Sequence, residues 1–229
     1  MDIRFLGHAC FMLEEGDTRV LIDPFLTGNP KAAVGADDVD PTHIFLTHGH
    51  ADHWGDIEAI AKRTSAQCVA IVELANWLGE QGVANTVDPS LGGTAEFDWG
   101  WARMVQAFHT NTTPDGTAVG QAAGYVIRIG GRTVYHAGDT CLFGDMKLIA
   151  ERTPPDVAML PIGGHYTMDR HDAAVAAALI GAPTVIPMHY NTFPAIEADA
   201  EAFKAEVESS TSSTVVILTP GDVHTEEED

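Results

Sequence analysis

The sequence has few cysteines. Only Cys10, Cys68 and Cys141 occur among 229 residues, and no two of them form a CxxC pair. An odd number of widely spaced cysteines argues against a disulfide framework and favours a reducing compartment. Because residues 1–10, MDIRFLGHAC, carry an acid at position 2 and no apolar run of signal length, we expect a cytoplasmic protein.

Basic residues are also scarce, since 12 Lys and Arg stand against 33 Asp and Glu and give a formal net charge of −21. Such a surplus repels phosphate backbones and anionic lipid surfaces, so neither nucleic acid nor a membrane is expected as a partner. The simplest role of the acidic side chains is to solvate the surface. Adaptation to a salt-rich habitat is a second interpretation, which a dependence of stability on KCl would support.

Long apolar runs are missing as well. No stretch approaches the roughly 18 apolar residues that a membrane span needs. Hydrophobic residues nevertheless make up 45% of the chain and charged residues 20%, which is enough apolar material for a packed core. Residues 1–229 are therefore expected to form one globular domain. No feature of the sequence defines an oligomeric state.

Short apolar segments between turn signals predict the strands. Residues 2–23 favour a β-meander that turns at EEGD, and residues 122–139 favour a hairpin that turns at Gly130-Gly131. The acidic residues 225–229 are expected to fray. Residues 24–41 are polar and punctuated by Gly and Pro, which predicts a long surface loop bordering a functional site.

Helices are expected over residues 56–64, 74–81, 169–182 and 195–210. The third of these has Asp169 as its expected N-cap and Gly181 near its end. In each half of the chain strands are followed by helices, and no linker divides the halves. This order predicts an α/β fold in which two sheets pack face to face with the helices outside.

The segment THGHADHWGD concentrates polar side chains directly after an apolar strand. His48, His50, Asp52 and His53 form an HxHxDH pattern. Each of these groups is costly to desolvate unless it is paired or coordinated, so a metal site is the simplest explanation. Residues two apart in an extended segment project to the same side, so His48 and His50 can chelate one ion while Asp52 and His53 face a second.

Three more polar residues stand where apolar strands stop: His109 in QAFHT, Asp139 in HAGDT and His189 in IPMHYN. Strand ends are where α/β enzymes place ligands and catalytic groups. Any one of the three could be an ordinary surface residue. Together with HxHxDH upstream, they indicate a site built from distant parts of the chain.

These motifs, with LGHACF and LPIGGHYTMD, resemble the metallo-β-lactamase superfamily over essentially the whole chain. The resemblance is strongest to its small metal-dependent hydrolases near the ascorbate-phosphate lactonases. It implies a four-layer αββα sandwich with the site at the sheet edges. By position it implies two divalent metal ions, Zn²⁺ before Mn²⁺, one held by His48, His50 and His109 and one by Asp52, His53 and His189, with Asp139 bridging both.

Two cations about 3.5–4 Å apart lower the pKa of a water between them from about 15.7 towards 7, so we expect a bridging hydroxide as the nucleophile. Asp52 is the expected residue for orienting that water. His165, in a Gly-rich strand-to-loop break, is a candidate acid for the leaving group, and a surface role is its alternative.

The remaining candidates lie near the predicted ligands. His8 is expected to hydrogen-bond to a ligand, and Tyr166 and Tyr190 carry hydroxyls that could reach a substrate or simply pack at the rim of the site. Cys141, two residues beyond Asp139, is expected to be a small buried hydrophobe rather than a ligand.

The favoured function is a dinuclear metal-dependent hydrolase acting on a small ester, lactone or phosphodiester. One alternative is a mononuclear iron oxidoreductase of the persulfide dioxygenase type, although the presence of both ligand sets favours two metals. A catalytically silent metal-binding protein is a second alternative. Nuclease activity is disfavoured, because the chain has no inserted domain and no basic surface.

Overall fold

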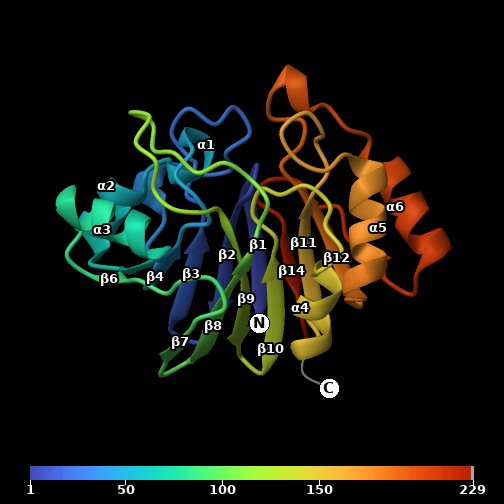
Figure 1. The fold of residues 1–229 in the computed structure, drawn as a ribbon, viewed down its shortest axis with the longest axis horizontal. Coiled ribbons are helices and arrows are strands. Elements are labelled where there is room, and N and C mark those ends of the chain that lie inside the picture. The colour runs from blue at the N-terminus through green and yellow to red at the C-terminus, as the bar shows by residue number, and fades with distance from the viewer. Residues whose placement is uncertain (228–229) are drawn as a thin grey trace.

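The computed structural model describes residues 1–227 and contains two seven-stranded sheets (Figure 1). The first sheet has the order β14-β1-β2-β3-β4-β5-β6 and the second β13-β12-β11-β10-β9-β8-β7. The strands of the first sheet are β1 Asp2–Gly7, β2 Cys10–Glu15, β3 Thr18–Ile22, β4 His43–Phe45, β5 Gln67–Val69, β6 Thr86–Val87 and β14 Val223–Thr225. Those of the second are β7 Thr94–Phe97, β8 Gly100–Gln106, β9 Ala123–Ile129, β10 Arg132–His136, β11 Val157–Pro161, β12 Thr184–Met188 and β13 Thr214–Val215.

Six α-helices lie outside the sheets within the described residues: α1 Ala51–Trp54, α2 Ile57–Thr64, α3 Val72–Glu80, α4 Met146–Arg152, α5 Arg170–Ile180 and α6 Ala200–Ser210. Helices α2 and α3 lie beside one sheet and α5 and α6 beside the other, as Figure 1 shows. Neighbouring strands joined by tight turns are antiparallel, whereas β10 to β13 run parallel because α4, α5 and α6 form the connections. The predicted αββα sandwich is confirmed.

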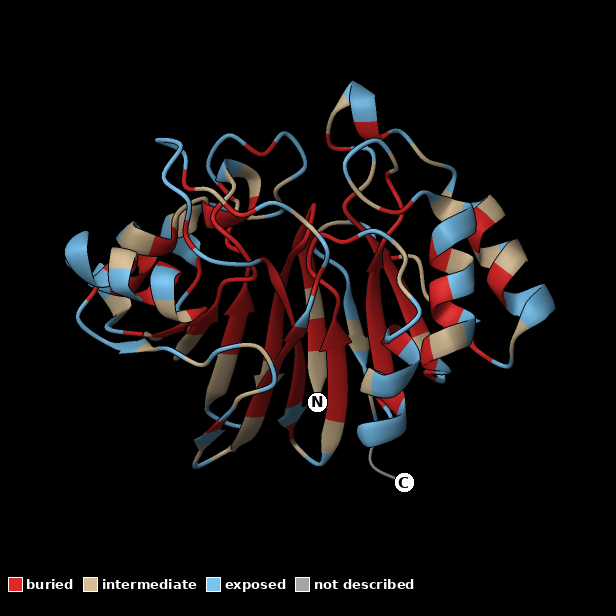
Figure 2. Ribbon diagram, in the orientation of Figure 1, coloured by how far each residue is buried: buried red, intermediate tan, exposed pale blue. Residues whose placement is uncertain are grey.

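The core lies between the two sheets, whose central strands are mostly buried (Figure 2). Phe45 of the first sheet and Tyr125 of the second have ring centroids 5.1 Å apart. The hydroxyl of Tyr125 donates to the carbonyl oxygen of Leu46 at 2.9 Å, which ties the sheets together at the end of β4. The position of that strand end is therefore fixed by both sheets.

The local signals read from the sequence are mostly confirmed. The carboxylate of Asp169 accepts hydrogen bonds from the amides of His171 and Asp172 and caps α5. Gly181 ends that helix with a left-handed φ of 67°, and Gly130 and Gly131 form the turn between β9 and β10. The last helix begins later than predicted, because residues 194–196 form a 3₁₀ turn before α6.

The prediction of a frayed tail is wrong for its first residues. Thr225 pairs with Asp2 as part of β14, and the amide of Glu226 donates to the carbonyl of Met1. Residues 228–229 of that predicted tail lie outside the described residues. The longest helices within residues 1–227 have 11 residues, and none of the described helices has the length and apolar character needed to cross a membrane.

Candidate metal centre

The candidate site lies at one edge of the sandwich, where the carboxyl ends of strands from both sheets meet. His8 follows β1, the His48 segment follows β4, and the second sheet contributes His109 after β8, Asp139 after β10 and His189 after β12. The structure therefore brings together all seven predicted ligands, which come from four separate parts of the chain. Loops at strand ends supply the functional groups, as in other α/β folds.

His48, His50 and His109 form one group of potential ligands. The Nε2 of His48 lies 3.0 Å from the Nδ1 of His50, and the Nε2 of His109 lies 3.2 Å from the same atom. Burial lowers the pKa of all three imidazoles, so they favour the neutral form that coordinates cations. This trio has the chemistry of a first-row metal site.

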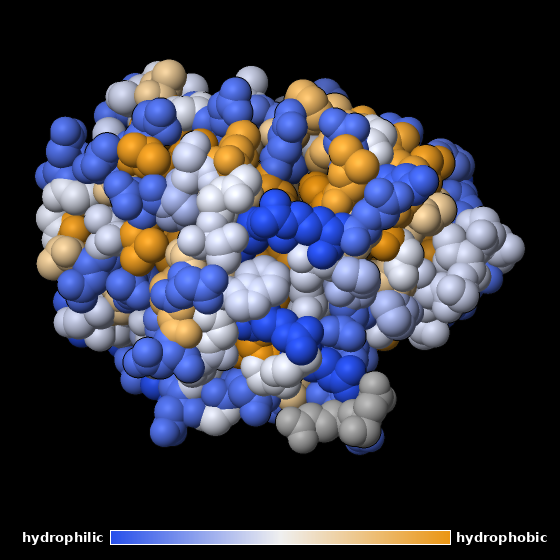
Figure 3. Space-filling model, turned by 60° about the horizontal axis from the view of Figure 1, so that its bottom comes forward, coloured by the Kyte–Doolittle hydropathy of each residue, from blue (hydrophilic) through white to orange (hydrophobic). Residues whose placement is uncertain are grey.

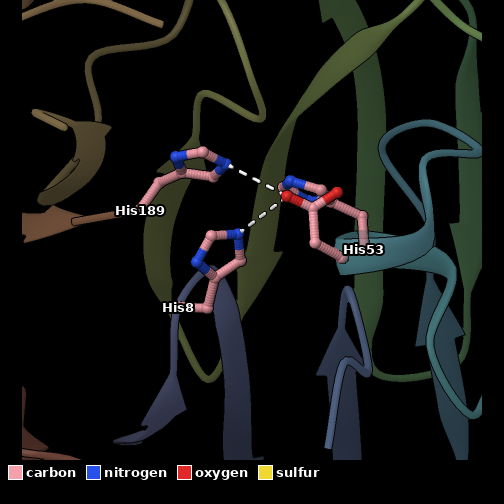
Figure 4. A group of neighbouring side chains, drawn as sticks. His8, His53 and His189 are labelled. Carbon is pink, nitrogen blue, oxygen red and sulfur yellow. Dashed lines mark hydrogen bonds and ion pairs between the residues drawn. The ribbon is translucent and has the colours of Figure 1, made fainter. Parts of the chain in front are cut away.

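Asp52, His53, His189 and His8 form the second group. Asp52 and His53 are neighbours on the short helix α1, so their side chains leave the axis about 100° apart. The buried ring of His53 points into the protein, whereas Asp52 faces the cavity. Figure 4 shows His8 and His189 directed at one carboxylate oxygen, the Oδ2 of Asp52, at 3.3 and 3.7 Å.

Asp139 lies between the two groups. Its Oδ1 is 3.2 Å from the Nε2 of His53, and its Oδ2 is 3.1 Å from the Nε2 of His189 and 3.6 Å from that of His109. Burial would raise the pKa of Asp139, but His189 and His53 hold it well below its ordinary range. An anionic carboxylate between two sets of nitrogen ligands is suited to contacting two cations at once.

Several buried atoms of this centre have no hydrogen-bond partner. Within residues 1–227, five buried side-chain atoms lack one, and four of these are His53 Nε2, Asp139 Oδ1, His189 Nδ1 and His189 Nε2. Unsatisfied polar atoms are costly in a protein interior. Nitrogen and carboxylate donors gathered around the same space fit divalent cations such as zinc, whose coordination would satisfy the atoms directed at it.

Asp23 is a functional residue that the sequence did not identify. It directly follows β3 and is fully buried. Its Oδ2 accepts hydrogen bonds from the Nδ1 of His53 at 2.7 Å and from the hydroxyl of Thr47 at 2.7 Å, and its Oδ1 accepts from the amide of Thr47 at 2.8 Å. The carboxylate thereby fixes the ring of His53 with Nε2 facing Asp139.

His8 joins the centre to the other sheet. Its Nδ1 lies 2.8 Å from the hydroxyl of Thr192, and its carbonyl accepts a hydrogen bond from the amide of His189 at 2.8 Å. Burial lowers the pKa of His8 to about 4, although its hydrogen bond with Asp52 opposes this. A neutral His8 fits its predicted role as a partner of a ligand.

Left-handed backbone is concentrated here. Of the six non-glycine residues with positive φ among the described residues, His8, Asp23 and His189 belong to this centre, with φ of 63°, 46° and 55°. Such conformations are strained for residues with a Cβ and persist where the surrounding structure enforces them. Their grouping shows that strained backbone conformations, which lower local stability, position several side chains of this centre.

A cavity of about 580 Å³ opens over the centre. Its walls include five polar or charged residues, His50, Asp52, His109, Thr110 and Asp139, and five others, Phe25, Ala51, Tyr166, Phe193 and Ala195. Phe25 belongs to the long loop that was predicted to border a site, and that loop does line the cavity. The volume is in the range of pockets for small molecules.

Two predicted participants lie away from this cavity. His165 is exposed and packs its ring on Tyr166, which is the member of that segment that lines the cavity. Tyr190 lines a separate hollow beside His8 and Lys31. Cys141 is exposed, so the prediction of a buried side chain is wrong. It stands in the irregular segment after Asp139, where no strand periodicity indicates which side chains point inward.

The sandwich fold and the edge cluster of His and Asp residues define the class. A family profile described as the beta-lactamase superfamily domain matches residues 2–189. The chain belongs to the beta-lactamase superfamily, as its motifs predicted.

Particular relatives are similar over the full length. A UPF0173 metal-dependent hydrolase from Symbiobacterium thermophilum is 48% identical over 228 residues, which cover 98% of this chain and 100% of that protein. A second one, from Methanopyrus kandleri, is 49% identical over 226 residues, which cover 97% and 98%. The solved structure of Igni18, a metallo hydrolase from the archaeon Ignicoccus hospitalis, has a TM-score of 0.91 at 36% identity and covers 100% of this chain and 99% of its own.

Proposed function

We propose that the protein is a metal-dependent hydrolase that holds two divalent cations, Zn²⁺ or Mn²⁺, and cleaves a small ester or lactone. The observation that carries this proposal is the place of Asp139, which lies between two groups of ligands and within 4.0 Å of His48, His53, His109 and His189. The names of the most similar relatives, metal-dependent hydrolases, support the same class of reaction.

In this proposal one cation is held by His48, His50 and His109, the other by Asp52, His53 and His189, and Asp139 contacts both. When bound, such a pair supplies an activated water at neutral pH and polarises the oxygen of the scissile bond. The protein then needs no serine or cysteine nucleophile.

The side chains of the chain position the reactants. Burial would raise the pKa of Asp52, but the neighbouring imidazoles of His189 and His8 lower it, so the carboxylate is anionic and can accept a proton at the cavity wall. His8 keeps Asp52 in place through its 3.3 Å contact. Tyr166 also lines the cavity, and its hydroxyl is suited to donating a hydrogen bond to a substrate oxygen.

The lining of the cavity favours an uncharged substrate. No Lys or Arg is among its lining residues, whereas Phe25, Tyr166 and Phe193 supply apolar surface. A phosphorylated substrate would have only the bound cations, and no cationic side chain, to balance its charge. An ester or lactone with an apolar group therefore fits better than a phosphodiester.

The test combines metal analysis with turnover. Wild-type protein and Asp139→Ala are purified, their metal content per chain is measured, and both are assayed on a panel of esters, lactones and phosphodiesters. We expect about two Zn or Mn per wild-type chain, and for the variant a lower metal content and a loss of kcat/KM of at least about 100-fold. Val175→Ala, an exposed position on α5, is the matched control.

Other results would contradict the proposal. One iron per chain with oxygen uptake would favour the mononuclear oxidoreductase instead. Protein that is fully loaded with metal but inert on the whole panel would favour a metal-binding protein without catalysis. Equal turnover by wild type and Asp139→Ala would remove Asp139 from its bridging role.

The cysteines and the size of the cavity bear on the location and the partner of the protein. We propose a cytoplasmic protein, because the three cysteines are free and two of them, Cys10 and Cys68, are buried. Its proposed partner is a small molecule, since the cavity is of that size.

A further inference from the structure

A second hollow lies between β8 and α4 and shares no lining residue with the metal cavity. It has a volume of about 380 Å³ and two arginines in its wall, Arg103 of β8 and Arg152 at the end of α4. In a chain with 12 basic residues and a net charge of −21, two guanidinium groups facing one hollow need an explanation.

Arg103 is buried, with 5% of its surface exposed. Within the described residues its guanidinium forms one hydrogen bond, from Nη1 to the hydroxyl of Thr153 at 3.0 Å, which leaves most of its five N–H donors free. Burial, and then the positive charge of Arg152, lower the pKa of Arg103. A buried charge without a counter-charge is unfavourable, so an anion in the hollow would stabilise this arrangement.

Five of the other six arginines have carboxylate partners, and the sixth, the exposed Arg128, donates to the hydroxyl of Thr133. Arg4 pairs with Glu14, Arg19 and Arg63 with Asp40, Arg132 with Asp156, and Arg170 with Glu206. In the described part of the chain no carboxylate lies within 4.0 Å of Arg103 or Arg152. Asp145 also lines the hollow, but it precedes α4, about 10 Å along the helix axis from Arg152.

The rest of the wall is mainly apolar. Leu91, Met104, Val105, Phe143, Leu148 and Ile149 surround the two arginines. Leu148 is 59% exposed, although a large apolar side chain on a helix usually packs inward. Figure 3 brings the lower end of the molecule forward and shows that hydrophilic and apolar residues are interspersed over this face.

We propose that this hollow binds a small organic anion, whose carboxylate or phosphate lies between Arg103 and Arg152 and whose apolar group lies against Phe143 and Leu148. Guanidinium groups match both kinds of anion through paired, charge-assisted hydrogen bonds. The apolar walls select against inorganic anions. The site is independent of the metal centre and of the reaction proposed there.

The test is calorimetric titration of the metal-loaded protein with 4-phenylbutanoate, with phenyl phosphate and with the uncharged 4-phenylbutanol. We expect the anions to bind in the hollow and the alcohol to bind at least about tenfold more weakly. Arg152 is exposed, and the variant Arg152→Met should weaken anion binding roughly 10- to 100-fold. Arg128→Met is the matched control, because Arg128 is exposed on neighbouring β9 and does not line the hollow, and it should bind as wild type does.

Arg103→Lys keeps the charge but removes the fork of donors, and it should bind more weakly while unfolding at a temperature close to that of wild type. The comparison of the two anions shows whether a carboxylate or a phosphate is preferred. Equal affinity of wild type and Arg152→Met for both anions would overturn the proposal, since the anions would then bind elsewhere, for example at the metal centre. Equal binding of the alcohol would also overturn it.

Discussion

The Oδ2 of Asp23 lies 2.7 Å from the Nδ1 of His53, and both side chains are fully buried. This contact leaves the Nε2 of His53 as the ring atom available to the proposed metal. We expect Asp23→Ala to weaken metal binding about 10- to 100-fold, because the ring of His53 loses its orientation. Competition with a chromogenic chelator measures the affinity. Asp17→Ala, at an exposed turn, should leave it unchanged, and an equal affinity of Asp23→Ala would contradict the role given to Asp23.

Removal of the cations should lower stability. The proposed ligands come from both sheets, so bound cations favour the folded chain and have little affinity for the unfolded one. At a free metal concentration of about 100 times Kd, the free energy of unfolding should rise by about 2.7 kcal/mol per site over that in chelator. Urea unfolding with and without chelator measures the difference. Asp139→Ala should show a smaller difference, and an equal one would argue that Asp139 does not bind metal.

His136 should make the metal-free protein sensitive to acid. Its Nε2 donates to the carbonyl of Ala9 at 3.0 Å and its Nδ1 accepts from the amide of Gly138 at 3.2 Å, so the folded ring is neutral. Burial lowers the pKa of His136 below the ordinary value of 6.5. Below that value the unfolded chain binds a proton that the folded chain does not, so stability is intact above pH 6.5 and falls as the pH drops.

The size of this effect is at most about 1.4 kcal/mol per pH unit. His136→Gln retains an amide donor but does not titrate, so its unfolding free energy should fall less steeply between about pH 6.5 and 5. Urea titrations of both proteins in chelator measure the slopes. Identical slopes would show that His136 does not carry this acid sensitivity.

Tyr166 and His165 are neighbours in one loop, and substituting each of them tests which one acts on the substrate. Tyr166 lines the cavity and His165 does not. We therefore expect Tyr166→Phe to lower kcat/KM about 5- to 15-fold, the value of one hydrogen bond, while His165→Ala remains within about twofold of wild type. Steady-state kinetics on the best ester of the panel measures both. A large loss in His165→Ala alone would restore His165 as the acid predicted from the sequence.

Much of the site could be read from the sequence because most of the proposed ligands stand within a few residues of the end of an apolar strand. A polar residue at such a place is conspicuous, as at His109, Asp139 and His189. Asp23 has the same signal, but from the sequence it is predicted only as the last residue of the β-meander. Its role depends on closeness to His53, which is 30 residues away along the chain. A pairing over that distance appears only when the strands are assembled.

Other features depend on backbone directions that residue types do not determine. The positive φ of His165, 54°, helps set the course of a Gly-rich loop in which Tyr166 reaches the cavity. The short strand β14 has no apolar alternation, and it exists because β1 offers it an edge. In both cases the neighbouring structure decides a conformation that the local sequence leaves open.

The proposed metal ligands stand within a few residues of strand ends or on the short helix α1, whereas Phe25, Tyr166 and Phe193 reach the cavity from loops, Phe193 just before a 3₁₀ turn. Chemistry and recognition are therefore carried by separable parts of the molecule. Exchanging these three segments for those of another member of the superfamily should transplant substrate preference onto an unaltered reaction centre. During evolution, substrate preference can therefore change through these loops while the reaction centre stays the same.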